Sequence, residues 1–99
     1  MTLLRLRQRA REDLIAIGVA GRDVWGDDAA LRYVKRLYGG LGTVAEHPEI
    51  GLACDEVRKG ARRLREGSYV IYHVAPDHGP VEVLRVLHVR MLPAAHVHE

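Results

Sequence analysis

Apolar residues at spacings of three and four predict two helices in the first half of the chain. The first begins near Arg9, and Glu12 and Asp13 are expected in its first turns, where the helix dipole favours acids. A turn follows at Gly26, and Asp27 or Asp28 can cap the second helix. The two apolar stripes are Ala10, Leu14, Ile17 and Gly21, then Ala30, Tyr33, Leu37, Leu41 and Val44. The second helix should end near Pro48, because the residue before a proline is pushed out of helical geometry. Together they predict a helical hairpin.

Strands are predicted on both sides of this hairpin. Residues 3–7 alternate as a short half-buried strand does. Residues 62–65 and 69–74 flank a Glu66-Gly67 turn, and residues 81–89 follow a Pro- and Gly-rich turn as the longest strand. Residues 48–60 lack strong periodicity and are expected to form a connection. The order strand, helix, helix and three strands predicts an α+β fold, with a helical hairpin on one face of a mostly antiparallel sheet.

Length and composition favour one small domain with an aliphatic core. Ninety-nine residues suit a single domain, with residues 93–99 as a tail. Hydrophobic residues make up 47% of the chain, yet it holds no Phe and one Trp. The one cysteine, Cys54, excludes an internal disulfide and is expected to be an inert thiol.

The charge is mildly positive and comes mostly from arginine. The net charge is +2 and the sequence pI is about 9.0, which is not the signature of a strong DNA-binding protein. Only Lys35 and Lys59 among the 15 basic residues are lysines. Arginine is suited to an interface, because guanidinium groups pair well with carboxylates. A GC-rich genome, which favours arginine codons, would explain the excess of arginine over lysine equally well. No long apolar run follows the arginines of residues 5–11, so neither a signal peptide nor a membrane span is expected, and we predict a cytoplasmic protein.

An ordered set of short motifs covers roughly residues 4–92 and resembles a known family. The motifs are Asp13-Leu14 with Ile17, Trp25-Gly26 with Ala30 and Tyr33, Pro48-x-x-Gly51, Arg58-x-Gly60-x-Arg62-x-Leu64, Gly67-Ser68, Tyr72, and Arg85-Val86-Leu87-His88-x-Arg90-Met91. In this order they resemble the ParE toxins of bacterial type II toxin–antitoxin systems, within the ParE/RelE fold group. The resemblance implies the ParE/RelE fold. It implies that the protein is a toxin that inhibits DNA gyrase and arrests growth, and that it needs no cofactor. It also implies neutralisation by a ParD-like antitoxin, and a protein that is not an enzyme.

By this resemblance, two features are expected to bind the antitoxin. An amphipathic antitoxin segment should lie along the helical hairpin at Leu31, Val34 and Tyr38. Its acids should reach the basic residues Arg58, Arg62, Arg63 and Arg65. Side chains alternate along a strand, so Arg62 and Arg63 are expected on opposite faces. The same charges could instead form a solvated edge that prevents aggregation.

The last strand supplies the candidates for contact with the target, which are Arg85, His88, Arg90 and Met91. RelE-like members of the fold group cleave mRNA on the ribosome, for which cations and a proton-transfer group are needed. His88 with Arg85 and Arg90 fits that chemistry only in part, because alternation turns Arg85 to the other face. A RelE-like mRNA endonuclease, and an inactive toxin that only binds its antitoxin, stay as alternatives.

Trp25 and the histidines complete the candidate residues. Trp25 is expected to pin the hairpin onto the sheet, with anchoring of a partner as the alternative. His96-Val97-His98 lacks further ligands in register, so no metal site is expected. Contact with a membrane, and specific DNA binding by this chain alone, are not expected either.

Overall fold

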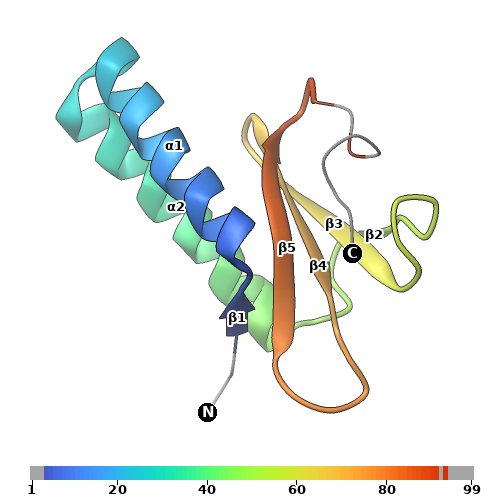
Figure 1. Ribbon diagram of the computed structural model, residues 1–99. Coiled ribbons are helices and arrows are strands. Elements are labelled where there is room, and N and C mark those ends of the chain that lie inside the picture. The colour runs from blue at the N-terminus through green and yellow to red at the C-terminus, as the bar shows by residue number, and fades with distance from the viewer. Residues whose placement is uncertain (1–3, 92, 94–99) are drawn as a thin grey trace.

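The computed structural model describes residues 4–91 and 93, which form two helices and five strands (Figure 1). The elements are β1 Leu4–Leu6, α1 Gln8–Trp25, α2 Asp27–Glu46, β2 Leu52–Ala53, β3 Ala61–Glu66, β4 Tyr69–Val74 and β5 Val81–His88. The predicted α+β class and element order are confirmed, with β2 as an added strand. The predicted tail at 93–99, including His96-Val97-His98, lies outside the described residues apart from Pro93. Neither helix, in the part of the chain that the structure covers, has a stretch apolar enough to cross a bilayer.

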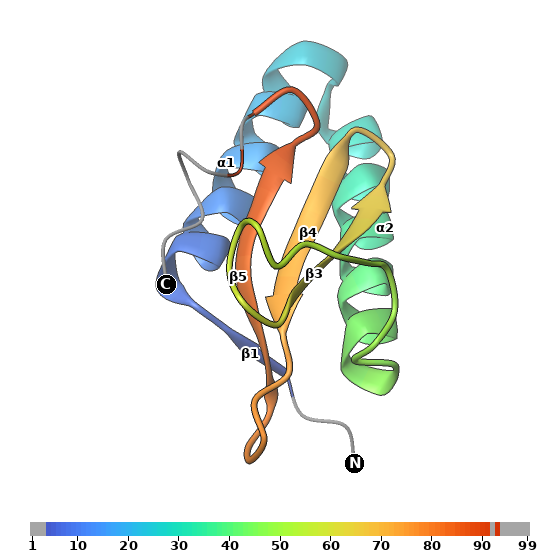
Figure 2. The ribbon, with the colours of Figure 1, turned by 90° about the vertical axis from the view of Figure 1, so that its right-hand side faces the viewer.

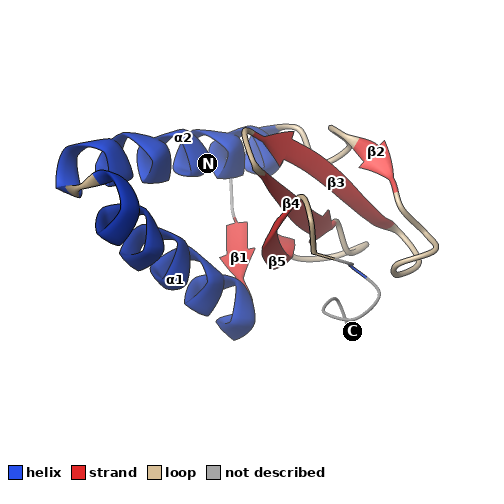
Figure 3. Cartoon of the chain, turned by 90° about the horizontal axis from the view of Figure 1, so that it is seen from above, coloured by secondary structure: helices blue, strands red, loops and turns tan. Residues whose placement is uncertain are grey.

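The sheet has the strand order β1-β5-β4-β3-β2. β1 runs parallel to β5, with Leu4 opposite Val81 and Leu6 opposite Val83, and the other neighbours are antiparallel. The chain's last strand therefore lies between its first strand and β4. Both helices lie on one side of the sheet, behind it in Figure 2 and to the left of β3, β4 and β5 in Figure 1, and Figure 3 shows α2 extending across β1.

The short edge strand β2 falls within the predicted connection. Its two residues pair with Arg62 and Arg63 of β3. Gly51 precedes it with a φ of +89°, and a Cβ at this position would overlap the backbone carbonyl of Arg63. Glycine is therefore required for the connection to approach β3 this closely.

The main core lies between the hairpin and the sheet. Its buried members are Ala10, Leu14, Ile17, Leu37, Leu41, Val44, Ile71, Val81, Val83 and Val86. The predicted α1 stripe is confirmed, because Ala10, Leu14, Ile17 and Gly21 are the buried residues of α1. In the α2 stripe only Tyr33 departs from the prediction, being half-buried. Gly40 is buried as well, since a Cβ there would lie 2.7 Å from Cγ of Glu66. α2 therefore packs closely on β3 at this point.

A smaller cluster covers the opposite face of the sheet. It consists of Cys54, Ala61, Tyr72, Leu84 and Leu87. The loop between β2 and β3 crosses in front of this face in Figure 2, and Val57 from the loop packs against the cluster. Burial, and secondarily the charge of Glu56, raises the pKa of the Cys54 thiol. The thiol form is thereby favoured over the reactive thiolate.

One helix end, the start of α2, differs from the prediction. α1 begins at Gln8, one residue before the predicted start, and Glu12 and Asp13 lie in its second turn. At the start of α2, Gly26 takes the N-cap position with a φ of +87°. Asp27 and Asp28 occupy the first turn of α2, and no side-chain hydrogen bond caps this helix. Their carboxylates therefore act on the helix dipole rather than as the predicted cap.

His73 gives the stability of this fold a dependence on pH. The side chain is fully buried on β4, opposite Arg62 of β3. Burial first, and then the charge of Arg62, lowers the His73 pKa, while the nearby Ile50 backbone acts in the opposite direction. Neither ring nitrogen of His73 has a hydrogen-bond partner among the residues described. The unfolded chain keeps the ordinary histidine pKa of about 6.5, so below that pH it binds more protons than the folded chain does. Stability should therefore be complete at neutral pH and fall as the pH drops below about 6.5.

We expect the urea midpoint of the protein to decrease between about pH 7.5 and pH 5.5. His73→Gln should remove much of this dependence, whatever its effect at neutral pH. His78→Gln is the matched control, because His78 is exposed in the turn after β4. An unchanged pH slope in His73→Gln would show that another group is responsible.

Candidate functional site

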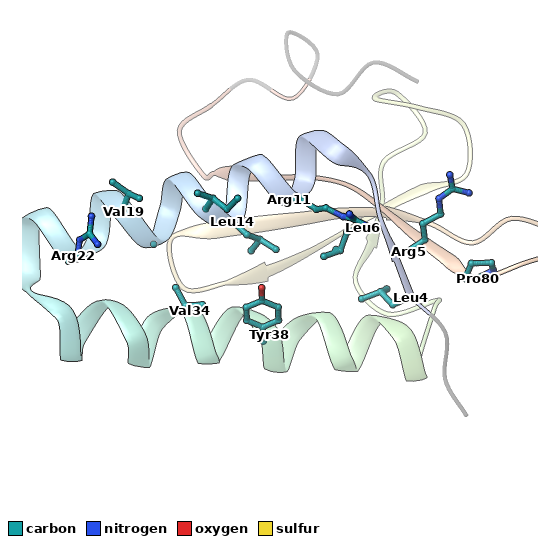
Figure 4. Close-up of a pocket in the computed structure, with 12 residues that line it drawn as sticks. Leu4, Arg5, Leu6, Arg11, Leu14, Val19, Arg22, Val34, Tyr38 and Pro80 are labelled. Atoms are coloured by element: carbon teal, nitrogen blue, oxygen red, sulfur yellow. The ribbon is translucent and has the colours of Figure 1, made fainter.

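An apolar groove lies between the two helices and extends to β1 (Figure 4). Its volume is about 840 Å³. Leu14 of α1 and Tyr38 of α2 project into the space between the helices in Figure 4. Ile15 and Val19 line the α1 side and are exposed, and Tyr38 is 54% exposed. Ile15, Val19 and Tyr38 form an apolar surface that no element of the chain covers among the residues described.

The groove results from a second apolar stripe on each helix. On α1 the core stripe is Ala10, Leu14, Ile17 and Gly21, and Ile15 and Val19 lie beside it at a spacing of four. On α2, Val34 and Tyr38 have the same spacing beside the core stripe. A helix with such a wide apolar face can bury one part against the sheet and offer the rest to a partner.

Arginines give the groove its charge. Arg5 of β1 and Arg11 and Arg22 of α1 are the ionised side chains among the lining residues described, which include no Asp or Glu. An apolar floor with cationic edges fits an amphipathic protein segment, with apolar residues on one side and acids beside them.

The structure places the predicted hairpin residues in or next to this groove. Val34 and Tyr38 line it. Leu31 is exposed on the same side of α2, one turn before them, and is not part of the lining. A partner that follows the groove along α2 would reach Leu31 as well. The sequence reasoning missed the contribution of α1 and β1, although Ile15 and Val19 carried the signal.

The predicted basic residues do not form one surface with the groove. Arg62 donates from Nη2 to the Gly51 carbonyl at 2.8 Å, and Arg65 donates from Nε to the Gly67 carbonyl at 2.8 Å. Arg63 pairs with Tyr72 in the β3–β4 register and Arg62 with His73, so the two arginines point to opposite faces as predicted. Arg58 lies in the loop after β2 and is half-buried. None of these four residues lines the groove.

Arg85, a predicted target-contact residue, is bound to Asp13. Its Nε and Nη2 donate to the two carboxylate oxygens at 2.7 and 2.8 Å, and each side chain is only 14% exposed. The same carboxylate accepts the backbone N–H of Val86 at 2.9 Å. β1 pairs with Val81–Val83 of β5 and not with the residues of β5 that follow. At Val86 the Asp13 carboxylate therefore accepts the backbone N–H that a neighbouring strand would otherwise bind. The hydrogen bond with Asp13 raises the pKa of Arg85, which keeps its charge fixed.

The other target-contact residues lie near the end of β5. The His88 ring packs edge-on against Tyr69 with centroids 5.4 Å apart, and its Nδ1 accepts the Arg90 backbone N–H at 3.2 Å. His88 and Met91 line a small cavity of about 280 Å³ that neither Arg85 nor Arg90 lines. Arg90 is exposed beyond the strand. The structure therefore does not bring His88 and the two arginines together.

The predicted role of Trp25 is wrong. Trp25 is 62% exposed at the end of α1, and its ring packs edge-on against that of Tyr33 with centroids 6.4 Å apart. Tyr33 makes the contact that was expected of Trp25. Its ring lies 5.6 Å from that of Tyr69, and its hydroxyl accepts the Ser68 N–H at 2.8 Å.

A metal site needs several ligand side chains close together. Across residues 4–91, no three His, Cys, Asp or Glu side chains gather as a metal site requires.

Known proteins are similar to this chain in sequence and in fold. The family model of the ParE toxin of type II toxin-antitoxin systems, parDE, matches residues 4–93. The protein named Toxin ParE1 of Mycobacterium tuberculosis (strain H37Rv) is 42% identical over 69 residues, which is 70% of each chain. The Toxin ParE1 of Caulobacter vibrioides is 36% identical over 93 residues, which is 94% of this chain and 95% of that one. A solved structure of a chromosomal ParDE TA system from P. aeruginosa has the same fold, with a TM-score of 0.78 over 91% of this chain and 98% of that chain at 20% identity.

Proposed function

Because the chain belongs to the ParE family of type II toxins, we propose that it inhibits DNA gyrase in the cytoplasm and that a ParD-like antitoxin neutralises it by docking in the groove. The groove is the observation that carries the antitoxin half of this proposal. Its apolar side chains come from both helices, and its arginines offer ion pairs at the edges. The family supports the gyrase half.

Binding in the groove would bury apolar side chains that now contact water. Ile15, Val19 and Tyr38 are exposed, and burial of apolar surface contributes about 25 cal/mol per Å². Ordering of the antitoxin segment offsets part of this gain. Tyr38 is the natural anchor, because it combines a large apolar ring with a hydroxyl that can stay in contact with water.

Inhibition by binding, without cleavage of a bond, is the mode of action that these residues support best. Cleavage of RNA needs cations and a proton-transfer group around one phosphate. Here Asp13 holds the Arg85 guanidinium, and the His88 ring packs against Tyr69. We therefore propose that the toxin acts as a ligand of its target.

Purified toxin should inhibit supercoiling by bacterial DNA gyrase in a dose-dependent manner. Addition of the ParD-like antitoxin from the neighbouring gene should restore supercoiling once it equals the toxin in amount. The same preparation is tested for cleavage of mRNA on ribosomes. Codon-biased cleavage with unaffected gyrase would replace this proposal with a RelE-like nuclease. Antitoxin binding with neither activity would leave only the antitoxin half standing.

A further inference from the structure

A second concave surface lies at the tip of the hairpin and is separate from the groove. This cleft has a volume of about 610 Å³ and lies between the α1–α2 tip and the β3–β4 turn. Both turns are at the same end of the molecule in Figures 1 and 2. Among the residues described, none lines both the cleft and the groove. On α2, Tyr33 and Arg36 line the cleft while Val34 and Tyr38 line the groove, so the two surfaces use different sides of the helix.

Four aromatic rings build the wall of the cleft as a continuous series. Trp25 and Tyr33 are 6.4 Å apart, Tyr33 and Tyr69 are 5.6 Å apart, and Tyr69 and His88 are 5.4 Å apart. The Ser68 N–H donates to the Tyr33 hydroxyl at 2.8 Å and fixes the Tyr33 ring between those of Trp25 and Tyr69. The wall is therefore already in place before a partner binds, which lowers the entropic cost of binding.

The composition of the cleft is that of a protein interface. Trp25 and its neighbour Val24 are both largely exposed, although burial of either would be favourable. Trp, Tyr and Arg are the residues most often found at the energetic centre of protein–protein contacts. All three types line this cleft, as Trp25, Tyr33, Tyr69 and Arg36.

The charge of the cleft indicates an acidic partner. Arg36 is the only Lys, Arg, Asp or Glu among its described lining residues. The Arg36 side chain is 60% exposed and its Nε contacts Oε1 of Glu66 at 3.2 Å, which orients the guanidinium next to the rings. A carboxylate of the partner would join Glu66 at this guanidinium, because the contact with Glu66 uses Nε and arginine has further N–H donors.

The ring geometry favours a protein over a nucleic acid. Bases bind to proteins by stacking on flat aromatic faces. Here the Trp25–Tyr33 and Tyr69–His88 pairs are nearly perpendicular, at 88° and 84°. Such an arrangement offers edges and a pocket for an inserted side chain rather than a series of parallel platforms.

We propose that this cleft is where the toxin holds its protein target. An exposed apolar side chain of the target inserts against Trp25 and Tyr33, and a neighbouring carboxylate of the target pairs with Arg36. This inference rests on the proposed function and adds to it a binding surface distinct from the antitoxin groove.

The test uses Trp25→Ala and Arg36→Glu in the full chain. Growth arrest on induced expression measures toxicity whatever the target is, and inhibition of gyrase supercoiling measures the proposed target. Trp25→Ala should raise the concentration for half-inhibition of gyrase roughly 30-fold, as expected for removal of an interface tryptophan. Both variants should lose growth arrest and keep their affinity for the ParD-like antitoxin. Thermal melts verify that they are folded.

Leu52→Ala is the matched control. Leu52 is 63% exposed, close to the value for Trp25, but lies on β2 at the far edge of the sheet. This variant should keep full toxicity.

The other outcomes separate the two proposals. If the wild type arrests growth without inhibiting gyrase, the gyrase target is wrong, and loss of arrest in Trp25→Ala still supports the cleft. Equal toxicity of Trp25→Ala and the wild type would overturn the cleft alone. Loss of antitoxin affinity in Trp25→Ala would assign the cleft to the antitoxin. A wild-type dimer in sedimentation that Trp25→Ala abolishes would assign it to a second copy. Either assignment overturns the proposal.

Discussion

Replacement of both Arg11 and Arg22 by glutamate is expected to weaken antitoxin binding at least about 100-fold, or by roughly 3 kcal/mol. The two arginines line the groove from α1. Each substitution removes an attraction and introduces a charge of the same sign as the acids of the antitoxin. Calorimetry in low salt measures the loss. Affinity of the wild type should decrease as salt is added, because exposed charges are screened, and the double variant should lose this dependence.

Arg65→Glu is the control that separates the groove from the basic residues of β3. Arg65 is exposed and contacts the Gly67 carbonyl outside the groove, so its replacement should change antitoxin affinity little. Arg62 is a poor choice, because its guanidinium holds the Gly51 carbonyl and its loss would disturb the connection before β2. An equal loss in Arg65→Glu would show that the acids of the antitoxin follow β3.

Replacement of Asp13 by alanine is expected to lower the free energy of unfolding by about 3 kcal/mol. The substitution leaves the nearly buried guanidinium of Arg85 without its carboxylate and the Val86 N–H without its acceptor. Both groups lose contacts that water cannot fully replace. Urea unfolding at neutral pH gives the difference in stability.

Two further variants at this position identify the cause. Glu12→Ala removes the neighbouring acid, which is exposed, accepts a hydrogen bond from Gln8 of its own helix and acts on Arg85 only as a more distant charge, so it should cost less than about 0.5 kcal/mol. Asp13→Asn keeps an acceptor for the Val86 N–H but removes the charge, so its stability should lie between those of alanine and the wild type. If Asp13→Ala is no worse than Glu12→Ala, the ion pair contributes little to the fold.

The periodic parts of the fold could be predicted from the sequence. Both helical stripes and the three strands of the second half are in place, because regular spacing is a strong signal over many residues. β2 could not be found, since two residues carry no period. The predicted cap of α2 is wrong because Gly26, with its positive φ, takes the N-cap position that Asp27 or Asp28 was expected to fill.

The candidate site was predicted only on the side of α2. Val34 and Tyr38 were found because they widen a clear stripe, whereas Ile15 and Val19 were overlooked beside the core stripe of α1. Of the three arginines of the groove, Arg11 and Arg22 lie on α1 itself, and only Arg5 depends on a long-range strand pairing. β1 is held beside β5 by pairing across more than 70 residues of sequence, as in Leu4 opposite Val81, and this places Arg5 next to α1. No local pattern reports such a contact.

The prediction for Arg85 failed in part for a similar reason. Strand alternation was expected to point it away from His88, but it did not indicate where the side chain would go. The register of β4 and β5 shifts between Tyr72 and His73, and Asp13 of α1 binds the guanidinium. A regular alternation cannot anticipate a bulge or a partner on a distant helix.

The position of β5 between β1 and β4 has a consequence for biosynthesis. As the chain leaves the ribosome, β1 and both helices emerge first, yet β1 has no strand to pair with until β5 has been made. Asp13 likewise cannot form its ion pair until Arg85 has been synthesised. A fold closed by such distant contacts can be completed only late in synthesis. The nascent toxin therefore stays without its complete sheet through most of translation, and an antitoxin that is already present can capture it as soon as it is finished.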